Sequence, residues 1–384
     1  MRIAEPDVDL PRVLLAEGEI EAFIRSWVAA SFGLLHYLGR SHTMTERETP
    51  KHSMTGTLPP YPHAYHQGLR YVLACVDASS FADAVLSHAA AMAVALKARM
   101  TVLRVLDVSA EQSPMDPVEW SMRHRDVEAD LRERASHFGG LQTDTAVIHG
   151  PAAEGICAWA RDNAVELTVL GRNGESNGSF AGLGGTVRRV AGVVNGSVLI
   201  VPPSQVVEAP IRYRRVLIPL DGSSRSESAL PLGLGIAAAH DAEIVLVHAA
   251  PSVDLTEAGP PEAETITLRD QLRRRNERTG EHYLKRVQFQ LPAAPTTRTR
   301  VLPSGDPRHA LAHAVVEEHA DLVVLSCTGQ SGHPDMSVGS VADYLINHMN
   351  IPILLVRGHE GSPATAYGKS GEAIPARLPS RALL

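Results

Sequence analysis

Short apolar runs alternate with longer helical stretches along most of this chain. In its first half, five runs are apolar at nearly every position, as strands buried on both faces of a parallel sheet are. Alanine-rich or amphipathic stretches separate them, which predicts right-handed crossovers that cover both faces of the sheet. The five runs are VLACV at 72–76, MTVLRVL at 100–106, TAVIHG at 145–150, LTVLG at 167–171 and SVLIVP at 197–202.

The whole series of elements occurs a second time. An aspartate follows the first run of each copy, and Asp77 and Asp221 are 144 residues apart. Later landmarks, such as Gly150 and Gly305, are 155 residues apart. The second copy therefore has 11 more residues, which must lie in the polar stretch 251–300, where insertions cost little. We expect a tandem duplication of an open α/β domain.

The duplication divides the chain into five parts. Domain 1 spans 69–203, domain 2 spans 214–357, and 204–213 is the linker between them. An N-terminal extension with a Pro-, Thr- and His-rich end, 1–68, precedes the domains. A Gly-, Ser- and Pro-rich tail, 358–384, follows them, and its composition predicts flexibility.

The N-terminal extension contains one predicted amphipathic helix, with apolar side chains at spacings of three, four and seven. This face would cover a groove, join a dimer or lie on a membrane, and the acidic flanks disfavour the membrane. If translation begins at Met44 or Met54, the helix is not part of the native chain. The apolar positions are Ile20, Phe23, Ile24, Trp27, Val28, Leu34, Leu35 and Leu38.

Composition and charge exclude several classes of protein. The chain has 36 Lys and Arg against 43 Asp and Glu, and this net charge of −7 argues against binding to nucleic acid. Three distant cysteines, Cys75, Cys157 and Cys327, exclude a disulfide scaffold and a CxxC-type zinc site. No run approaches the roughly 18 apolar residues of a membrane span, and the acidic start is unlike a signal peptide. We expect a cytoplasmic protein.

The candidate chemistry lies where the strands end. Ligands of open parallel sheets bind past the carboxyl ends of the strands, at the point where the strand order reverses. In each copy an aspartate follows the first strand (Asp77, Asp221) and a glycine follows the third (Gly150, Gly305). The aspartate can accept a hydrogen bond from an amino or hydroxyl group, and the glycine lets a ligand approach the backbone closely.

The loop after the fourth strand carries the strongest signal. In the second copy, Gly329 is followed by nine residues and then by Gly339 and Ser340 at the start of a helix. Exposed N–H groups and a helix N-terminus together form a seat for phosphate, to which a serine hydroxyl adds a donor. The first copy has Gly171, two residues, Gly174, nine residues and Gly184.

These motifs resemble those of the universal stress protein family in its tandem form. The family signature is Gly, two residues, Gly, nine residues, and Gly followed by Ser or Thr. The resemblance covers both copies and implies two flavodoxin-like domains of the adenine nucleotide alpha hydrolase-like type, each an open five-stranded parallel sheet with ATP at its carboxyl edge. The residues it implies for the nucleotide are Asp221, Ala249, Gly305, Leu325, Ser326, Gly329, Gly339, Ser340 and Val341 in the second copy, and Asp77, Val105, Gly150, Leu170, Gly171, Gly174, Gly184 and Thr186 in the first.

Each copy departs from the signature once. Ser326 replaces the first glycine in the second copy, which is a small change in size. In the first copy Gly185 takes the Ser/Thr position, unless the register slides by one residue to place Thr186 there. The second site is therefore the stronger candidate. The alternative for both is that these glycines only end strands and begin helices.

The resemblance implies a nucleotide-dependent signalling protein. ATP, with or without Mg²⁺, would change the conformation or a surface that an unknown protein partner contacts. No carboxylate pair, Ser/His/Asp set or P-loop is evident, so no catalytic residue and no metal ligand is assigned. A slow ATPase or phosphotransfer enzyme and a nucleotide-free scaffold stay open as alternatives. The family pairs domains through the last strand, here 199–202 and 353–356, which implies a pseudo-dimer within one chain and allows a further homodimer.

Three smaller features have mainly structural interpretations. His309 and His313 are four residues apart on a predicted helix, but nothing in the sequence completes a metal-ligand set. The run RDQLRRRNERTGEHYLKR mixes acids with arginines and is typical of an exposed helix face. Trp120 at a helix start is interpreted as a packing residue.

Overall fold

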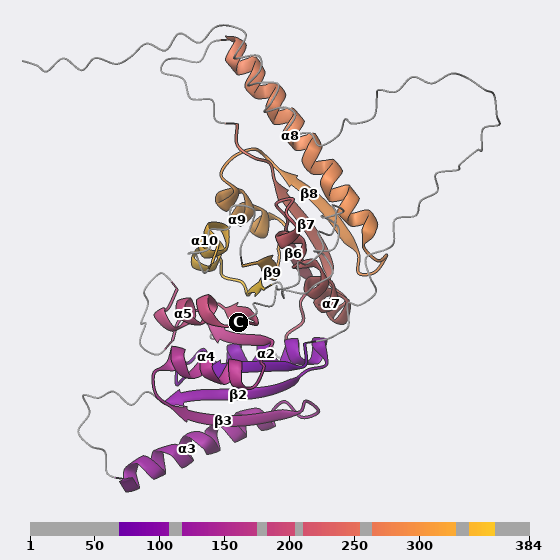
Figure 1. Cartoon of the computed structure of the whole chain (residues 1–384). Helices are drawn as coiled ribbons and strands as arrows, with labels where there is room; N and C mark the ends of the chain where they lie inside the picture. The colour runs from indigo at the N-terminus through magenta and orange to yellow at the C-terminus, as the bar shows by residue number, and fades with distance from the viewer. Residues whose placement is uncertain are drawn as a thin grey trace, which may run out of the picture. The chain divides into compact units, whose positions relative to one another are not determined.

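The described part of the chain lies within one compact unit, residues 58–384. In this computed structural model, the ten described strands form one continuous sheet (Figure 1). The α/β fold class expected from the sequence is confirmed. The predicted N-terminal helix and the tail lie outside the described residues, which are 69–106, 117–174, 183–203, 210–253, 263–327 and 338–357.

The described part of repeat 1 alternates strands and helices. In chain order its elements are β1 (Tyr71–Val76), α2 (Ala82–Leu96), β2 (Arg99–Leu106), α3 (Pro117–Ser136), β3 (Thr143–His149), α4 (Ala152–Asp162), β4 (Leu167–Gly171), α5 (Gly185–Val193) and β5 (Ser197–Val201). The strands are parallel and lie in the order β3-β2-β1-β4-β5. The chain moves outward from β1 to β3 and then crosses to the other side of β1, so the strand order reverses between β1 and β4.

Repeat 2 has the same internal order. Its elements are β6 (Arg215–Pro219), α6 (Ser224–Glu227), α7 (Leu230–His240), β7 (Glu243–Ala249), α8 (Ala263–Gln290), β8 (Thr297–Leu302), α9 (Pro307–Glu317), β9 (Leu322–Ser326), α10 (Ser340–His348) and β10 (Ile353–Val356). The strands lie in the order β10-β9-β6-β7-β8. Most of the extra length predicted between 251 and 300 is in α8, which has 28 residues where α3 has 20.

The duplication is visible even in the backbone conformation of helix ends. Lys97 after α2 and Asp241 after α7 are equivalent residues, and both have a left-handed φ, of 54° and 55°. Each donates its N–H to carbonyls of the last helical turn, as a C-cap residue does. Ala164 and His319 form a second equivalent pair, with φ of 51° and 50°. The two copies thus share a backbone path where their residue types differ.

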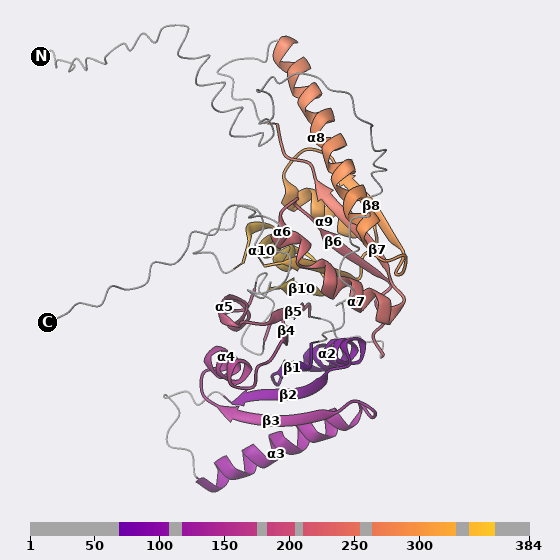
Figure 2. The same cartoon turned by 45° about the vertical axis from the view of Figure 1, so that its right-hand side comes forward.

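Two apolar cores lie on the two faces of the sheet, and each runs through both repeats. Successive strand residues point to opposite faces, so Ala74 of β1 joins one core and Leu73 joins the other. The first core is covered by α2, α3, α7 and α8, and the second by α4, α5, α9 and α10 (Figure 2). The inner strands β1, β4, β5, β9 and β10 are buried on both faces, which is why their sequences are continuously apolar, whereas the outer strands β3 and β8 are only partly buried.

The two repeats meet through their last strands. Strands β5 and β10 pair in antiparallel orientation, with Leu354 opposite Leu199. Every residue of both strands is buried. The junction that the family resemblance implies is therefore present within this chain, and it joins two parallel five-stranded sheets into one.

A second contact between the repeats lies in the helix layer. The ring nitrogen Nδ1 of His88 on α2 is 2.8 Å from the hydroxyl of Tyr213, which comes just before β6. Tyr213 is fully buried and also packs edge-on against His240 of α7, with ring centroids 5.0 Å apart. Burial lowers the pKa of His88 to about 4 and lowers the pKa of His240 in the same direction.

The junction gives a stability prediction. Leu354 has no exposed surface, so Leu354→Ala removes packing from the first core and leaves a cavity. We expect the free energy of unfolding to fall by about 2–5 kcal/mol. Val316→Ala on the outside of α9, where the valine is 64% exposed, is the control and should change it by less than about 0.5 kcal/mol. Equal effects of the two substitutions in denaturant titrations would contradict a buried junction.

The buried histidine gives a prediction for pH. The folded chain binds a proton at His88 only near pH 4, whereas the unfolded chain binds one near 6.5. The contribution of His88 to the free energy of unfolding is therefore fully present above about pH 6.5. This contribution is lost as pH falls towards 4, and the loss is roughly 3 kcal/mol at most. His88→Gln should flatten this part of the slope in denaturant titrations from pH 8 to 4. A slope unchanged in this variant would show that His88 titrates normally.

Candidate functional site

The reversal of strand order brings two loops together in each repeat. Strand β1 lies between β2 and β4, and β6 lies between β7 and β9. The segments that follow β1 and β4 therefore leave the sheet side by side at its carboxyl edge, and so do those that follow β6 and β9. Ligands of doubly wound sheets bind at such a point.

In repeat 1 the aspartate and the glycine loop are in contact. Asp77 directly follows β1, and its Oδ1 accepts a hydrogen bond of 3.0 Å from the N–H of Ser79. The backbone of Gly174 lies against the other carboxylate oxygen, since a Cβ built on Gly174 would be 2.9 Å from Asp77 Oδ2. A side chain at this position would therefore have to displace the Asp77 carboxylate. Two of the residues that the sequence nominated are thus neighbours.

In repeat 2 the equivalent carboxylate is held by serines. The Oδ1 of Asp221 accepts from the N–H of Ser223 at 2.9 Å and from its hydroxyl at 2.6 Å. The N–H of Asp221 donates to the hydroxyl of Ser226 at 3.2 Å. The loop after β6 is therefore a compact turn that fixes the orientation of this aspartate.

The loop after the fourth strand closes in the same way in both repeats. The N–H of Gly184 donates to the carbonyl of Arg172 at 3.1 Å, and the N–H of Gly339 donates to the carbonyl of Cys327 at 2.8 Å. Each glycine is the N-cap of the following helix, α5 or α10. Each loop therefore starts beside the end of its strand and returns there to begin a helix.

This shared geometry shows which residue of repeat 1, Gly185 or Thr186, takes the Ser/Thr position of the signature. Because Gly184 and Gly339 are equivalent N-caps, Gly185 is the residue that corresponds to Ser340. Thr186 corresponds to Val341 and is one residue further into α5. The first repeat thus has no hydroxyl at the first helical position, where the second repeat has an exposed serine.

The ends of the third strands differ more. Gly150, directly after β3, has a φ of +126°, which a residue with a Cβ rarely adopts. Gly305 does not have a positive φ and is followed by Asp306, the N-cap of α9. Asp306 accepts from the N–H of Arg308 and pairs with its guanidinium, which lowers the pKa of Asp306 to about 2.

The other nominated residues end strands at the same edge, and Gly329 lies outside the described residues. Val105, Leu170 and Leu325 each precede the last residue of their strand, and Ala249 is the last residue of β7. The last residues of β4 and β9 are Gly171 and Ser326. The nominated residues that the structure describes therefore gather around the carboxyl edge of each repeat.

Sequence reasoning missed the residue that links the first loop to the second repeat. The Arg172 guanidinium donates to the carbonyls of Ile346 and Met349, at 3.2 and 2.8 Å, at the C-terminus of α10. In the other direction, Arg357 donates to the Ala191 carbonyl in α5. Each arginine therefore stabilises carbonyls at the end of a helix in the opposite repeat. Nothing in local spacing signals a contact across more than 160 residues.

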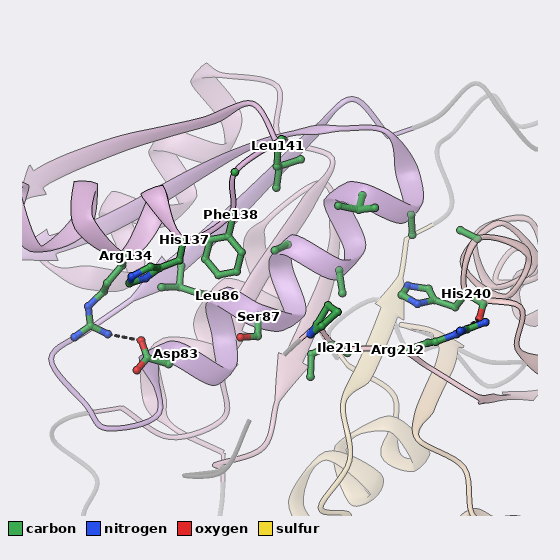
Figure 3. Close-up of a pocket in the computed structure, with 18 residues that line it drawn as sticks. Asp83, Leu86, Ser87, Arg134, His137, Phe138, Leu141, Ile211, Arg212 and His240 are labelled. Carbon is green, nitrogen blue, oxygen red and sulfur yellow. Dashed lines mark hydrogen bonds and ion pairs between the residues drawn. The ribbon is translucent and has the colours of Figure 1, made fainter. Parts of the chain in front are cut away.

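A groove of about 860 Å³ lies elsewhere, along α2 (Figure 3). Leu86 of α2, Phe138 and Ile211 line it, and an ion pair of 2.6 Å between Arg134 and Asp83 closes one end. No residue nominated from the sequence lines this groove. It opens in the helix layer and not at the carboxyl edge, so it is separate from the candidate site.

The described residues contain no group of three or more metal-ligating side chains. His309 hydrogen-bonds to the Tyr344 hydroxyl at 3.0 Å, and His313 lies 3.2 Å from Glu317. Cys327, beside the second loop, is buried, and burial raises the pKa of its thiol. Nor, in the part of the chain that the structure describes, is any helix long and apolar enough to cross a membrane.

These observations define a class of protein: a tandem, doubly wound α/β chain with an aspartate and a closed glycine loop at the carboxyl edge of each repeat. The model of the universal stress protein family matches residues 68–202 and 212–357. The chain belongs to this family.

Relatives and solved structures agree with this assignment. Universal stress protein MJ0531 of Methanocaldococcus jannaschii is 28% identical over 148 residues, which cover 38% of this chain and 82% of that protein. The fold matches a universal stress protein from Archaeoglobus fulgidus with a TM-score of 0.56 and 16% identity, covering 78% of this chain and 100% of that one. It also matches the functionally unknown protein PA1789 of Pseudomonas aeruginosa, with a TM-score of 0.54, 14% identity and coverage of 76% and 93%.

The arginine contact between the repeats gives a third prediction. Arg172→Ala leaves the last carbonyls of α10 without a charged donor in a partly buried position. We expect the free energy of unfolding to fall by about 1.5–3 kcal/mol, the usual range for a hydrogen bond to a charged group. Arg188→Ala, an exposed arginine on α5, is the matched control and should have little effect in the same denaturant titration. If only Arg188→Ala lowered the free energy of unfolding, the stabilising role of Arg172 would be ruled out.

Proposed function

We propose that the chain binds ATP or a closely related adenine nucleotide at the carboxyl edge of its repeats and acts as a nucleotide-dependent stress-response protein. The observation that carries this proposal is the loop closure that both repeats share. In each, the hydrogen bond of the N-cap glycine holds a helix N-terminus beside the end of β4 or β9. The N–H groups and partial positive charge of a helix start favour phosphate, and membership of the family supports the same ligand.

Repeat 2 is the stronger candidate for this ligand. Ser340 is the first residue of α10, and its side chain can donate to a phosphate oxygen that the neighbouring N–H groups also reach. Asp221 lies at the adjacent loop and is oriented by Ser223, so it can accept from an amino or hydroxyl group of the nucleotide. A Mg²⁺ ion can accompany the phosphates without a preformed protein site.

Repeat 1 should bind more weakly. Gly185 offers no hydroxyl where Ser340 does, and a hydrogen bond to a charged oxygen contributes about 1.5–3 kcal/mol. The loop also contacts the aspartate directly, since Gly174 lies against Asp77. A nucleotide in this repeat must therefore fit beside that contact.

Two other functions are tested by the same measurement. In a slow ATPase or phosphotransfer enzyme, the nucleotide would be turned over. In a nucleotide-free scaffold, the closed loops would only connect strands to helices, and partner contacts elsewhere would carry the function. Nucleotide content after purification distinguishes all three.

The prediction is that untagged protein retains adenine nucleotide. After denaturation, anion exchange of the supernatant should give about one or two ATP per chain. Ser340→Ala should weaken ATP binding by roughly tenfold or more, because one donor to a charged oxygen is lost. Gly174→Glu should abolish binding in repeat 1, because it forces a side chain against Asp77.

Ser228→Ala is the matched control for the serine variant. Its hydroxyl donates to the Arg225 carbonyl within the turn after α6, and its loss should leave ATP binding unchanged. If the protein contains no nucleotide and takes up no added ATP with Mg²⁺, the scaffold is the correct function. If ADP accumulates with time and Ser340→Ala prevents it, the enzyme is correct.

A further inference from the structure

Three aromatic rings meet at one corner of repeat 1, outside the candidate nucleotide site. Trp120 and His124 are on the first turns of α3, and His149 is the last residue of β3. The Trp120 ring centroid is 4.7 Å from that of His149 and 5.7 Å from that of His124. Trp120 is 42% exposed, so the cluster is open to solvent.

The two imidazoles face each other through ring nitrogens. Nδ1 of His124 is 3.2 Å from Nε2 of His149, and the ring centroids are 5.2 Å apart. Burial and the neighbouring His124 both lower the pKa of His149. In this contact one ring nitrogen donates its hydrogen to the other, and the tautomers of the two rings decide which nitrogen is the donor.

This arrangement has the dimensions of a two-histidine metal site. A tetrahedral ion with metal–nitrogen bonds of about 2.0–2.1 Å holds two ligand nitrogens about 3.3 Å apart. The facing nitrogens, 3.2 Å apart, are already at nearly that separation. A tetragonal Cu²⁺ ion, whose adjacent nitrogens are about 2.9 Å apart, requires only a small approach of the two rings. To coordinate an ion, the donating ring moves its hydrogen to its other nitrogen, so both facing nitrogens become acceptors and each ring stays neutral.

We propose that His124 and His149 bind a divalent transition-metal ion, with water in the remaining coordination positions. Imidazole nitrogens select Cu²⁺, Ni²⁺ and Zn²⁺ over Mg²⁺ and Ca²⁺, and among these Cu²⁺ binds most tightly. The Trp120 ring packs against both imidazoles and limits their rotation, which keeps the two nitrogens together.

The site belongs to one repeat. Ser304 is the residue of repeat 2 that corresponds to His149, and its hydroxyl donates to the carbonyl of Pro251 at 2.7 Å. Repeat 2 therefore has a serine hydroxyl where repeat 1 has the His149 imidazole. We expect one ion per chain at this corner, whatever nucleotide the repeats bind. The metal proposal can therefore be tested independently of the nucleotide proposal.

Tryptophan fluorescence provides the test on the full chain. Paramagnetic Cu²⁺ held by His149 lies within a few ångströms of the Trp120 indole and should quench its emission in a saturable way at one ion per chain. Trp120→Phe should remove this quenching, although Trp27 and Trp159 remain. Zn²⁺ does not quench and binds more weakly, so a large excess of Zn²⁺ should displace Cu²⁺ and restore the emission. Quenching that is linear in Cu²⁺ and insensitive to Zn²⁺ would overturn the proposal.

The histidine variants give the second arm. His124→Ala and His149→Ala should each weaken Cu²⁺ binding by at least about tenfold. Loss of a residue that only hydrogen-bonds to a metal ligand already lowers metal affinity by about that factor. His137→Ala, a histidine just after α3, is the matched control and should bind Cu²⁺ normally. Cu²⁺ should also raise the thermal midpoint of the native chain and not that of either site variant. Equal affinities in all variants that fold would show that the ion binds elsewhere.

Discussion

The antiparallel pairing of β5 with β10 is the constraint on which the rest of the structure depends. Both strands are apolar and buried, so neither could end a sheet without exposing an apolar strand with unpaired backbone N–H and C=O groups. Their pairing makes both apolar cores continuous between the repeats. The pairing also places β4 next to β5 and β9 next to β10, so the strands that precede the two candidate loops each lie one strand away from the junction. Arg172, in the loop after β4, and Arg357, after β10, each donate to a helix of the opposite repeat, so the two repeats are also joined by side chains near this junction.

Much of the fold follows from the sequence because its signals are local and occur twice. Continuous apolar runs identified the strands, and a fixed separation between landmarks identified the duplication and located the extra residues that lengthen α8. The aspartate after the first strand and the glycines after the fourth lie at the carboxyl edge because parallel strands must end there. The contacts of Arg172, of His88 with Tyr213 and of His124 with His149 could not be predicted in this way. They join residues whose positions in the chain carry no mutual spacing signal, and only the packed helices bring them together.

The two repeats keep the backbone of the duplicated domain while their side chains differ. The loop-closing hydrogen bonds and the left-handed helix ends are equivalent in both. Yet Ser340 corresponds to Gly185, His149 corresponds to Ser304, and an α8 two turns longer takes the place of α3. Backbone geometry is held by the sheet and its crossovers, which are the same in both repeats. This is why the edge can change in one repeat without disturbing the other.

The covalent connection between the repeats has a consequence for assembly. Two separate subunits that share an interface of this kind dissociate on dilution and exchange partners with related subunits. A short connector such as 204–213 keeps the two halves at a local concentration on the order of millimolar, whatever the amount of protein in the cell. The chain therefore behaves like a heterodimer whose composition is fixed at synthesis. Every molecule has one carboxyl edge from repeat 1 and one from repeat 2, and the repeats cannot exchange with those of another molecule.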